Sequence, residues 1–270
     1  MECNYSSVRL RWQRRAWKEI RRWREGRAAL RARMERPGAS LEAGLLGILR
    51  DPALSQQDRA AAGRLLGIDG RARGVEALLG QFFSQSEQWE LYMTASALEE
   101  LGDRRAVGPL IRALRDENPH RRTGAARALG WMRQPSRAVA MALAECLADG
   151  SQRVETREEA AESLSYVGTR ETVEALIAVL EDPEPRVRFW TVFGLGGICR
   201  KDERATRALE RMLGDTELMP GWWSVGQEAL GMLSCLGDRY QLQCQEEVRR
   251  IRADTEASEH DRRWADGYGS

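Results

Sequence analysis

Residues 181–196 read EDPEPRVRFWTVFGLG, and residues 115–130 read RDENPHRRTGAARALG. Both stretches have acidic residues followed by a proline near their start, continue through arginine and small residues, and end in Leu-Gly. Proline and acidic side chains are typical of the first turn of a helix. The shared pattern indicates one helical unit that the chain uses more than once.

A second pattern precedes each of these stretches. Apolar residues at i, i+3, i+4 and i+7 form one stripe of a helix. The stripe recurs five times, with spacings of 32 or 34 residues, and its copies begin at Val75, Val107, Val139, Val173 and Ala205. Each copy is followed by a second helix with a leucine at one shared position, which is Leu98, Leu129, Leu164, Leu195 or Leu233. No alternating strand pattern is evident, so the period predicts an all-α solenoid of stacked helical hairpins.

The quoted stretches resemble HEAT repeats, in particular the short bacterial type named after phycobilisome lyases. The resemblance covers roughly residues 40–240 and implies a right-handed α-solenoid of about six HEAT-like helical hairpins. It also implies that acidic and basic side chains pair between neighbouring repeats as a structural ladder, at Asp116, Arg122, Arg157, Asp182 and Arg188. The resemblance is specific for the fold and poor for the function, because such repeats serve many roles.

Charge divides the chain into segments. Residues 1–36 hold twelve Lys and Arg against four Glu, a net charge of +8, so the remainder carries −7 of the overall +1. We expect a basic amphipathic helix at 1–36, the solenoid at 37–252 and a disordered tail at 253–270. The N-terminal helix has two readings. It is a cap over the open end of the array, or an arm for an acidic partner, RNA or an anionic membrane through Arg11, Arg14, Arg15, Lys18, Arg21 and Arg22.

Candidate binding residues follow from the leucine register. In this type of solenoid the second helices line the concave surface, and positions nine before, five before and two after the shared leucine lie on an adjacent stripe. An exposed row of large rings is typical of a recognition surface, and the alternative is that the rings fill gaps between repeats. The predicted concave-face residues are Trp89, Met93, His120, Trp131, Glu159, Tyr166, Arg186, Trp190, Trp222, Trp223 and Glu228.

Motifs for catalysis are lacking. The sequence has no GxxxxGK[ST] loop, no GxGxxG and no GxSxG, and two histidines with scattered cysteines offer little to a metal. The sequence therefore favours a non-catalytic scaffold that binds a protein or peptide in the groove, without a cofactor. One alternative is a subunit like the phycobilin lyases, which the resemblance suggests, with a linear tetrapyrrole in the groove. Another is a HEAT-like nucleic-acid-binding protein or DNA glycosylase, which the net acidic array disfavours.

The sequence carries few signals of a cellular location. The longest plainly aliphatic run, residues 175–180, is far shorter than the roughly 20 residues of a spanning helix, and no secretory signal is visible. The five cysteines are scattered and odd in number. We therefore expect reduced thiols that act as small buried hydrophobes in a cytoplasmic protein.

Overall fold

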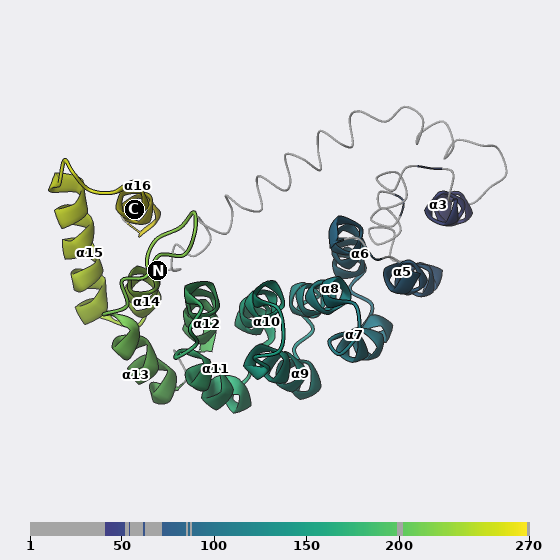
Figure 1. Cartoon of the computed structure of the whole chain (residues 1–270), viewed down its shortest axis with the longest axis horizontal. Coiled ribbons are helices and arrows are strands. Elements are labelled where there is room, and N and C mark those ends of the chain that lie inside the picture. Colours follow the sequence, from purple (N-terminus) through teal and green to yellow (C-terminus); the bar gives the residue numbers. More distant parts are fainter. Residues whose placement is uncertain are drawn as a thin grey trace. The chain divides into compact units, whose positions relative to one another are not determined.

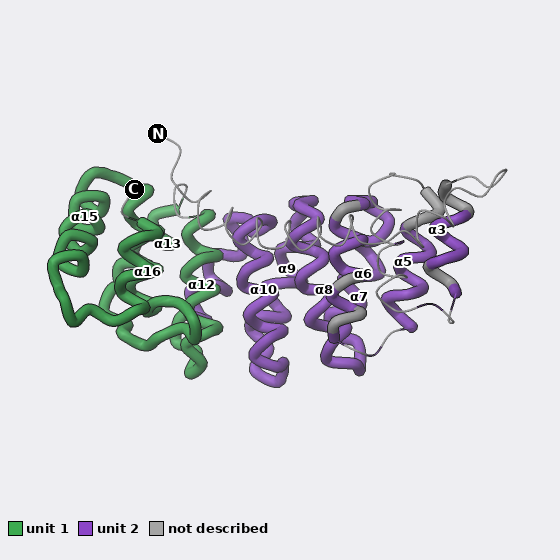
Figure 2. The backbone as a smooth tube through the Cα atoms, turned by 90° about the horizontal axis from the view of Figure 1, so that it is seen from above, with its two compact units in different colours: residues 1–28, 180–270 green, residues 29–179 purple. Residues whose placement is uncertain are grey.

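Paired helices recur through the described part of the chain. The computed structural model describes residues 41–268, apart from 52–53, 55–61, 63–71, 85, 87 and 199–201. The basic segment 1–36 and most of the first repeat therefore lie outside the described residues. The chain divides into two compact units, with the boundary between Val179 and Leu180, coloured purple (unit 2, before it) and green (unit 1, after it) in Figure 2.

Unit 2 is a stack of helical hairpins. The second helices α6, α8 and α10 form one row and the first helices α7, α9 and α11 form another (Figure 1), with α8 packed on α6 and α10, and α9 on α7 and α11. We call the first of these the second-helix row. The bounds are α3 Leu41–Arg50, α5 Ala72–Ser84, α6 Gln88–Leu101, η1 Arg104–Ala106, α7 Val107–Ala113, α8 Pro119–Trp131, α9 Arg137–Ala148, α10 Val154–Val167, η2 Arg170–Thr172 and α11 Val173–Val179.

Unit 1 repeats this arrangement and ends differently. Helix α12 packs on α14, α13 packs on both, and α15 packs on α14 and α16. The bounds are α12 Pro185–Ile198, α13 Glu203–Met212, α14 Val225–Leu233, α15 Asp238–Ala253 and α16 Glu259–Tyr268. The prediction of a disordered tail at 253–270 is wrong for most of that range, because α16 is a helix whose Trp264 is fully buried.

The leucine register places the core. All five shared leucines of the second helices are buried, as are the leading apolar residues of the first helices apart from the half-buried Val107. Complete burial of one leucine side chain contributes roughly 2 kcal/mol. Because neighbouring hairpins within each unit bury these side chains against one another, the stacked α-helical repeat predicted from the period is confirmed.

The turn residues start the helices as their chemistry requires. Pro119 and Pro185 are the first residues of α8 and α12, where a missing N–H is harmless. The side chain of Asn118 caps α8 by accepting a hydrogen bond from the backbone N–H of His120 at 2.8 Å. The long turn 214–224 closes with an antiparallel bridge between Leu218 and Ser224, the one β-bridge within the described residues.

The cysteines correct one expectation. Cys146 and Cys244 are buried free thiols, and burial raises the pKa of each to about 11. Cys235, however, is disulfide-bonded, so the expectation that all thiols are reduced is wrong. The cysteine argument for a cytoplasmic location is thereby removed. None of the helices in the described ranges is both long and apolar enough to cross a bilayer.

Candidate binding face

The repeated arginines hold the turns between helices. In α8, the Arg122 Nη1 donates to the carbonyl oxygen of Asp116 at 2.9 Å, and its Nε donates to the Gln152 side chain of the next hairpin at 2.6 Å. The carboxylate of Asp116 accepts from the backbone N–H of Asn118 at 2.8 Å. The same guanidinium therefore ties its own turn to the following repeat.

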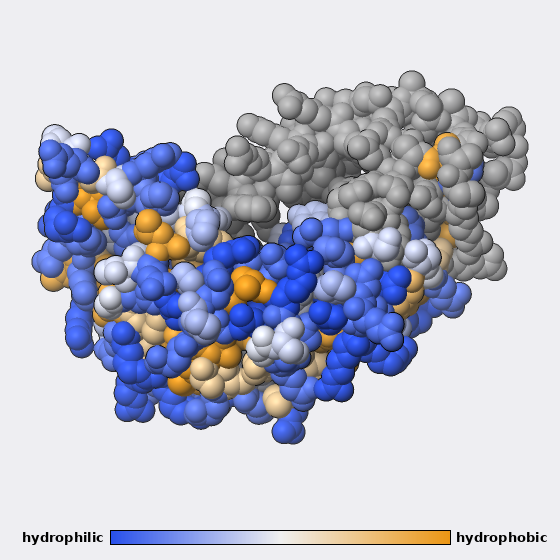
Figure 3. Space-filling model, in the orientation of Figure 1, coloured by the Kyte–Doolittle hydropathy of each residue, from blue (hydrophilic) through white to orange (hydrophobic). Residues whose placement is uncertain are grey.

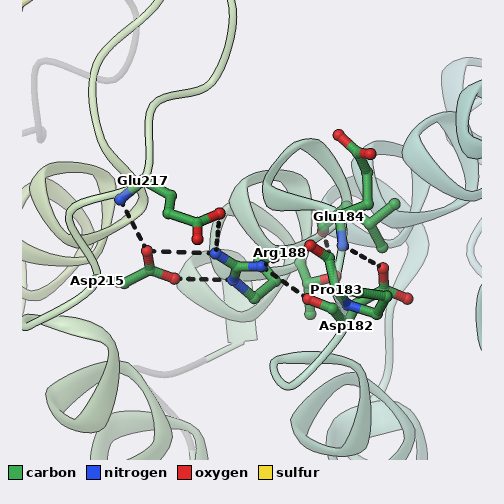
Figure 4. Close-up of polar contacts among 8 residues, drawn as sticks. Asp182, Pro183, Glu184, Arg188, Asp215 and Glu217 are labelled. Atoms are coloured by element: carbon green, nitrogen blue, oxygen red, sulfur yellow. Dashed lines mark hydrogen bonds and ion pairs between the residues drawn. The ribbon is translucent and has the colours of Figure 1, made fainter.

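Arg188 repeats this geometry in unit 1 (Figure 4). Its Nη1 donates to the carbonyl oxygen of Asp182 at 2.7 Å, and its Nε donates to the Asp215 carboxylate at 2.8 Å. The Asp215 hydrogen bond, followed by that of Glu217, raises the pKa of the Arg188 guanidinium. The side chain of Arg188 is 11% exposed, which makes this pair stronger than a surface ion pair. Asp182 itself accepts from the backbone N–H of Glu184 at 3.0 Å.

The sixth repeat replaces the arginine with backbone. Gly226 stands at the expected arginine position, and its N–H donates to the carbonyl oxygen of Asp215 at 2.8 Å. A Cβ at this position would lie 2.7 Å from the Leu213 oxygen and 2.8 Å from the Asp215 oxygen, so only glycine allows the approach. The repeated turn thus receives its hydrogen bond from a guanidinium or from a main-chain amide. Arg157 is buried at the matching position of α10.

A polar cluster in unit 2 centres on Arg127. The guanidinium carbon lies 4.0 Å from the ring centroid of Tyr92 and 4.3 Å from that of Trp131. Its Nη1 donates to Glu159 Oε1 at 3.0 Å, and its Nη2 donates to the Tyr92 hydroxyl at 2.7 Å. These residues come from α6, α8 and α10, so one arginine joins three successive second helices.

The charges around Arg127 are mainly negative. Burial raises the pKa of the Glu159 carboxyl, and Arg127 only partly offsets this effect. Burial alone lowers the pKa of Arg127, but Glu159, Tyr92 and Glu162 raise it, so the guanidinium stays charged. Burial also raises the pKa of the Tyr92 phenol, Arg127 lowers it, and the fields of Glu159, Glu162 and Glu99 raise it further. The Tyr92 hydroxyl therefore lies in the field of one guanidinium and three carboxyl groups, and such a surface disfavours a phosphate backbone.

The rings of this cluster are accessible. Tyr92 is 41% exposed, and Trp131 and Tyr166 are half-buried. Trp131 and Tyr166 meet edge to face with their ring centroids 6.3 Å apart, and the Tyr166 hydroxyl donates to Glu162 at 3.2 Å. The second-helix row of unit 2 thus presents rings whose orientation is fixed by neighbouring side chains. We call Tyr92, Arg127, Trp131, Glu159 and Tyr166 the Arg127 cluster.

Unit 1 has a glutamate at the matching repeat position. Glu228 lies five residues before Leu233, as Glu159 lies five before Leu164. Its carboxylate accepts from Trp223 Nε1 at 2.7 Å and from the Tyr268 hydroxyl at 3.4 Å. Glu228 is 2% exposed, and burial raises its pKa to about 7 although the two donors lower it.

Helix α16 covers this part of α14. Trp264 Nε1 donates to the Gln227 carbonyl oxygen at 2.9 Å, and the Gln227 side chain donates to Asp261 at 2.7 Å. The Tyr268 ring lies against Gly231, where a Cβ would come within 2.2 Å of it. The C-terminal helix of the chain therefore occupies the surface of unit 1 that corresponds to the Arg127 cluster of unit 2.

A sequence profile of HEAT repeats matches residues 75–155 and 141–218. The chain belongs to the HEAT-repeat family. The matched HEAT segments include the helices that carry Arg127, Glu159 and Arg188. No curated protein sequence matches the chain.

Comparison with solved structures found one that shares the fold and others with weaker likeness. The complex of CpcE and CpcF of phycocyanin lyase from Nostoc sp. PCC7120 is 20% identical, with 91% of this chain and 98% of that chain covered and a TM-score of 0.52. An engineered protein is 19% identical over 89% of this chain and 69% of its own, with a TM-score of 0.49. A designed armadillo repeat protein is 15% identical over 72% of this chain and 98% of its own, with a TM-score of 0.44. At these identities the likeness to the lyase complex shows the fold alone.

The residues predicted for the HEAT concave face lie in different surroundings in the structure. Trp131, Glu159 and Tyr166 come together in unit 2, while Trp190 and Trp222 lie half-buried and edge to face in unit 1, with ring centroids 6.2 Å apart. His120 lies in the first turn of α8 and Arg186 in that of α12, both half-buried. The side chains of Trp89 and Met93 lie outside the described residues, as do Arg11, Arg14, Arg15, Lys18, Arg21 and Arg22.

Two of the predicted residues need correction. Trp223 and Glu228 were expected on an exposed binding face, yet they are 5% and 2% exposed. Their rings and carboxyl group pack beneath α16, with the Trp223 and Tyr268 centroids 5.9 Å apart. The expectation failed because the tail sequence has no sustained apolar stripe that would indicate the covering helix.

Sequence reasoning missed Tyr92 and Arg127. Arg127 lies two residues before the shared Leu129, a position absent from the chosen stripe. The available signal is the i, i+4 spacing of Arg127 and Trp131 on one helix face.

Within the described ranges, no three His, Cys, Asp or Glu side chains are grouped so that they could hold a metal ion. On the face in Figure 3 the described surface is mostly hydrophilic, with scattered hydrophobic patches.

Proposed function

We propose that the chain is a non-catalytic scaffold that binds another protein or peptide on the second-helix row of unit 2. The observation that carries this proposal is the Arg127 cluster, where rings from three successive helices are accessible to solvent. Large rings give contact area at low entropic cost, and they dominate binding energy at protein interfaces. Arg127 holds Tyr92 and Trp131 in place before any partner arrives, which lowers the entropic cost of binding.

A displayed peptide library, panned against the full chain, tests the proposal. We expect enriched peptides whose affinity falls at least about tenfold for Trp131→Ala, the loss typical of an interface anchor. The matched control is Met141→Ala, which removes an exposed apolar side chain (37% exposed) from the first helix α9. Peptides that bind the Trp131 and Met141 variants equally well would refute the proposal. Melting temperatures of both variants separate lost binding from lost folding.

A second candidate is a role like that of phycobilin lyases, favoured by a likeness to the phycocyanin lyase complex that extends over 91% of this chain. The rings of Trp131 and Tyr166 could stack on an open-chain tetrapyrrole, whose propionates would need cations. Both Nη atoms of Arg127 are already engaged, which counts against this candidate. Co-expression with a bilin-producing pathway tests it. A purified protein that absorbs visible light supports the candidate, and a colourless one contradicts it.

A further inference from the structure

The Arg127 cluster leaves negative charge on the second-helix row. Arg127 is 8% exposed, and both Nη atoms of its guanidinium donate within the protein, to Glu159 and to Tyr92. Its Nε is buried and has no hydrogen-bond partner among the described residues. Glu162 and Glu99 act on the same Tyr92 hydroxyl. A ligand that approaches the Tyr92 ring therefore meets the fields of these carboxyl groups, while both Nη atoms of Arg127 are already engaged.

The cationic side chain of Arg133 lies against the Tyr166 ring of the cluster. Its guanidinium carbon lies 5.7 Å from the Tyr166 ring centroid, and the residue is exposed. Its backbone has φ 48°, the one positive φ outside glycine among the described residues. Arg133 follows the end of α8, at a position where glycine is strongly preferred, so an arginine there carries a conformational cost. A strained residue that places a cation over a ring points to a use for that contact.

A buried acceptor lies in the same cluster. Glu159 Oε2 is buried and has no hydrogen-bond partner among the residues that the structure describes. Its other oxygen is paired with Arg127. A buried carboxylate oxygen without a donor is costly, and a ligand with N–H donors and positive charge is the chemical class that would relieve that cost.

We infer that the second-helix row of unit 2 recognises a cationic side chain, arginine or lysine, on the bound peptide. The cation lies against the rings of Trp131 and Tyr166, close to the carboxyl groups of Glu159 and Glu162. In the free protein Arg133 covers the Tyr166 ring, and a ligand cation replaces it. This inference rests on the proposed function, because it names the chemistry of the peptide at that same surface.

The test uses a synthetic ten-residue peptide of alternating arginine and alanine, and a second peptide with neutral citrulline in place of each arginine. We expect the full chain to bind the arginine peptide at least about tenfold more tightly, because citrulline keeps the shape and loses the charge. Equal affinity for the two peptides would overturn the inference.

Protein variants separate a specific site from general attraction. Glu162→Gln keeps an acceptor for the Tyr166 hydroxyl and should weaken the arginine peptide about threefold, while the control Glu145→Gln on α9 should leave affinity unchanged. Arg133→Gly should tighten binding about threefold, since it removes a competing cation. Weaker binding by the Arg133 variant, or equal effects of the two glutamine variants, would contradict the inference.

The two proposals fail differently. If the displayed library yields peptides that depend on Trp131 but are not enriched in arginine or lysine, the cation inference falls and the scaffold function stands. If no selected peptide depends on Trp131, the proposed function itself is refuted.

Discussion

Two glutamates at the same repeat position have opposite surroundings. In unit 2, Glu159 is paired with a guanidinium and lies beside accessible rings. In unit 1, Glu228 receives two neutral donors and is sealed beneath α16. The difference teaches that the repeat fixes the position of a side chain. Whether a further helix covers that position decides the charge of the side chain and its exposure to solvent. An open position keeps an ion pair, and a covered one keeps a carboxyl group that titrates near neutral pH.

The largest expected effect is on the free energy of unfolding, when the Arg127 cation is removed from unit 2. Arg127→Ala should lower the free energy of unfolding by about 3 kcal/mol, because it leaves Glu159 buried without its partner. Denaturant unfolding measures this change. The matched control is Arg115→Ala, since Arg115 forms an exposed pair with Glu145 and should cost less than about 0.5 kcal/mol. Equal losses in the two variants would break the comparison.

The second effect is a pH dependence that arises at Glu228 in unit 1. The pKa of Glu228 is raised to about 7 from an ordinary 4.5, so the folded state keeps its proton while the unfolded state loses it. Stability from this group is complete below pH 4.5 and decreases by roughly 3 kcal/mol as pH rises to 7. Glu228→Gln should remove this decrease in denaturant unfolding measured between pH 5 and pH 8. Parallel pH profiles for the wild type and the variant would contradict the buried neutral carboxyl.

The third prediction concerns the packing of α16 over α14. Gly231→Ala places a methyl group where the Tyr268 ring now lies, so this ring must move, alone or with α16, at a cost of about 1 to 3 kcal/mol. Limited proteolysis within residues 254–258 reports on the release of the helix. Gly237→Ala is the control, because a Cβ there meets nothing within 4 Å. Similar proteolysis of both variants would mean that α16 does not depend on this contact.

The smallest effect concerns the strained arginine. Arg133→Gly should raise the stability of the protein by about 0.5 to 1 kcal/mol, because glycine adopts the positive φ without a Cβ penalty. Thermal unfolding measures the change. A lower melting temperature would show that the contact with Tyr166 outweighs the backbone strain, and would weaken the comparison between an available face and a sealed one.

The sequence predicted the repeated fold better than the binding face. The buried leucines, such as Leu129 and Leu164, recur at a fixed period and are hydrophobic, so pattern alone places them. The same register brought Trp131 and Glu159 to one cluster. It could not reveal Arg127, because an arginine inside a helix usually points to solvent and only the neighbouring rings make it a buried partner.

The burial of Glu228 beneath α16 could not be predicted from the sequence, for a different reason. Helix α16 is ten residues long and carries only one short apolar face, formed by Trp264, Ala265 and Tyr268. Such a short stripe among charged residues is typical of a frayed terminus, and its stability as a helix comes from packing on α14. A tertiary contact of this kind leaves no period in the sequence.

Hydroxyl-radical footprinting of the full chain, with and without a peptide selected from the library, tests the central claim most directly. We predict that Tyr92 and Trp131 react in the free protein and become protected when the peptide binds, whereas Trp264 stays unreactive in both states. Protection that leaves Tyr92 and Trp131 unchanged, or a Trp264 as reactive as Tyr92 in the free protein, would contradict the account of an open face in unit 2 and a covered one in unit 1.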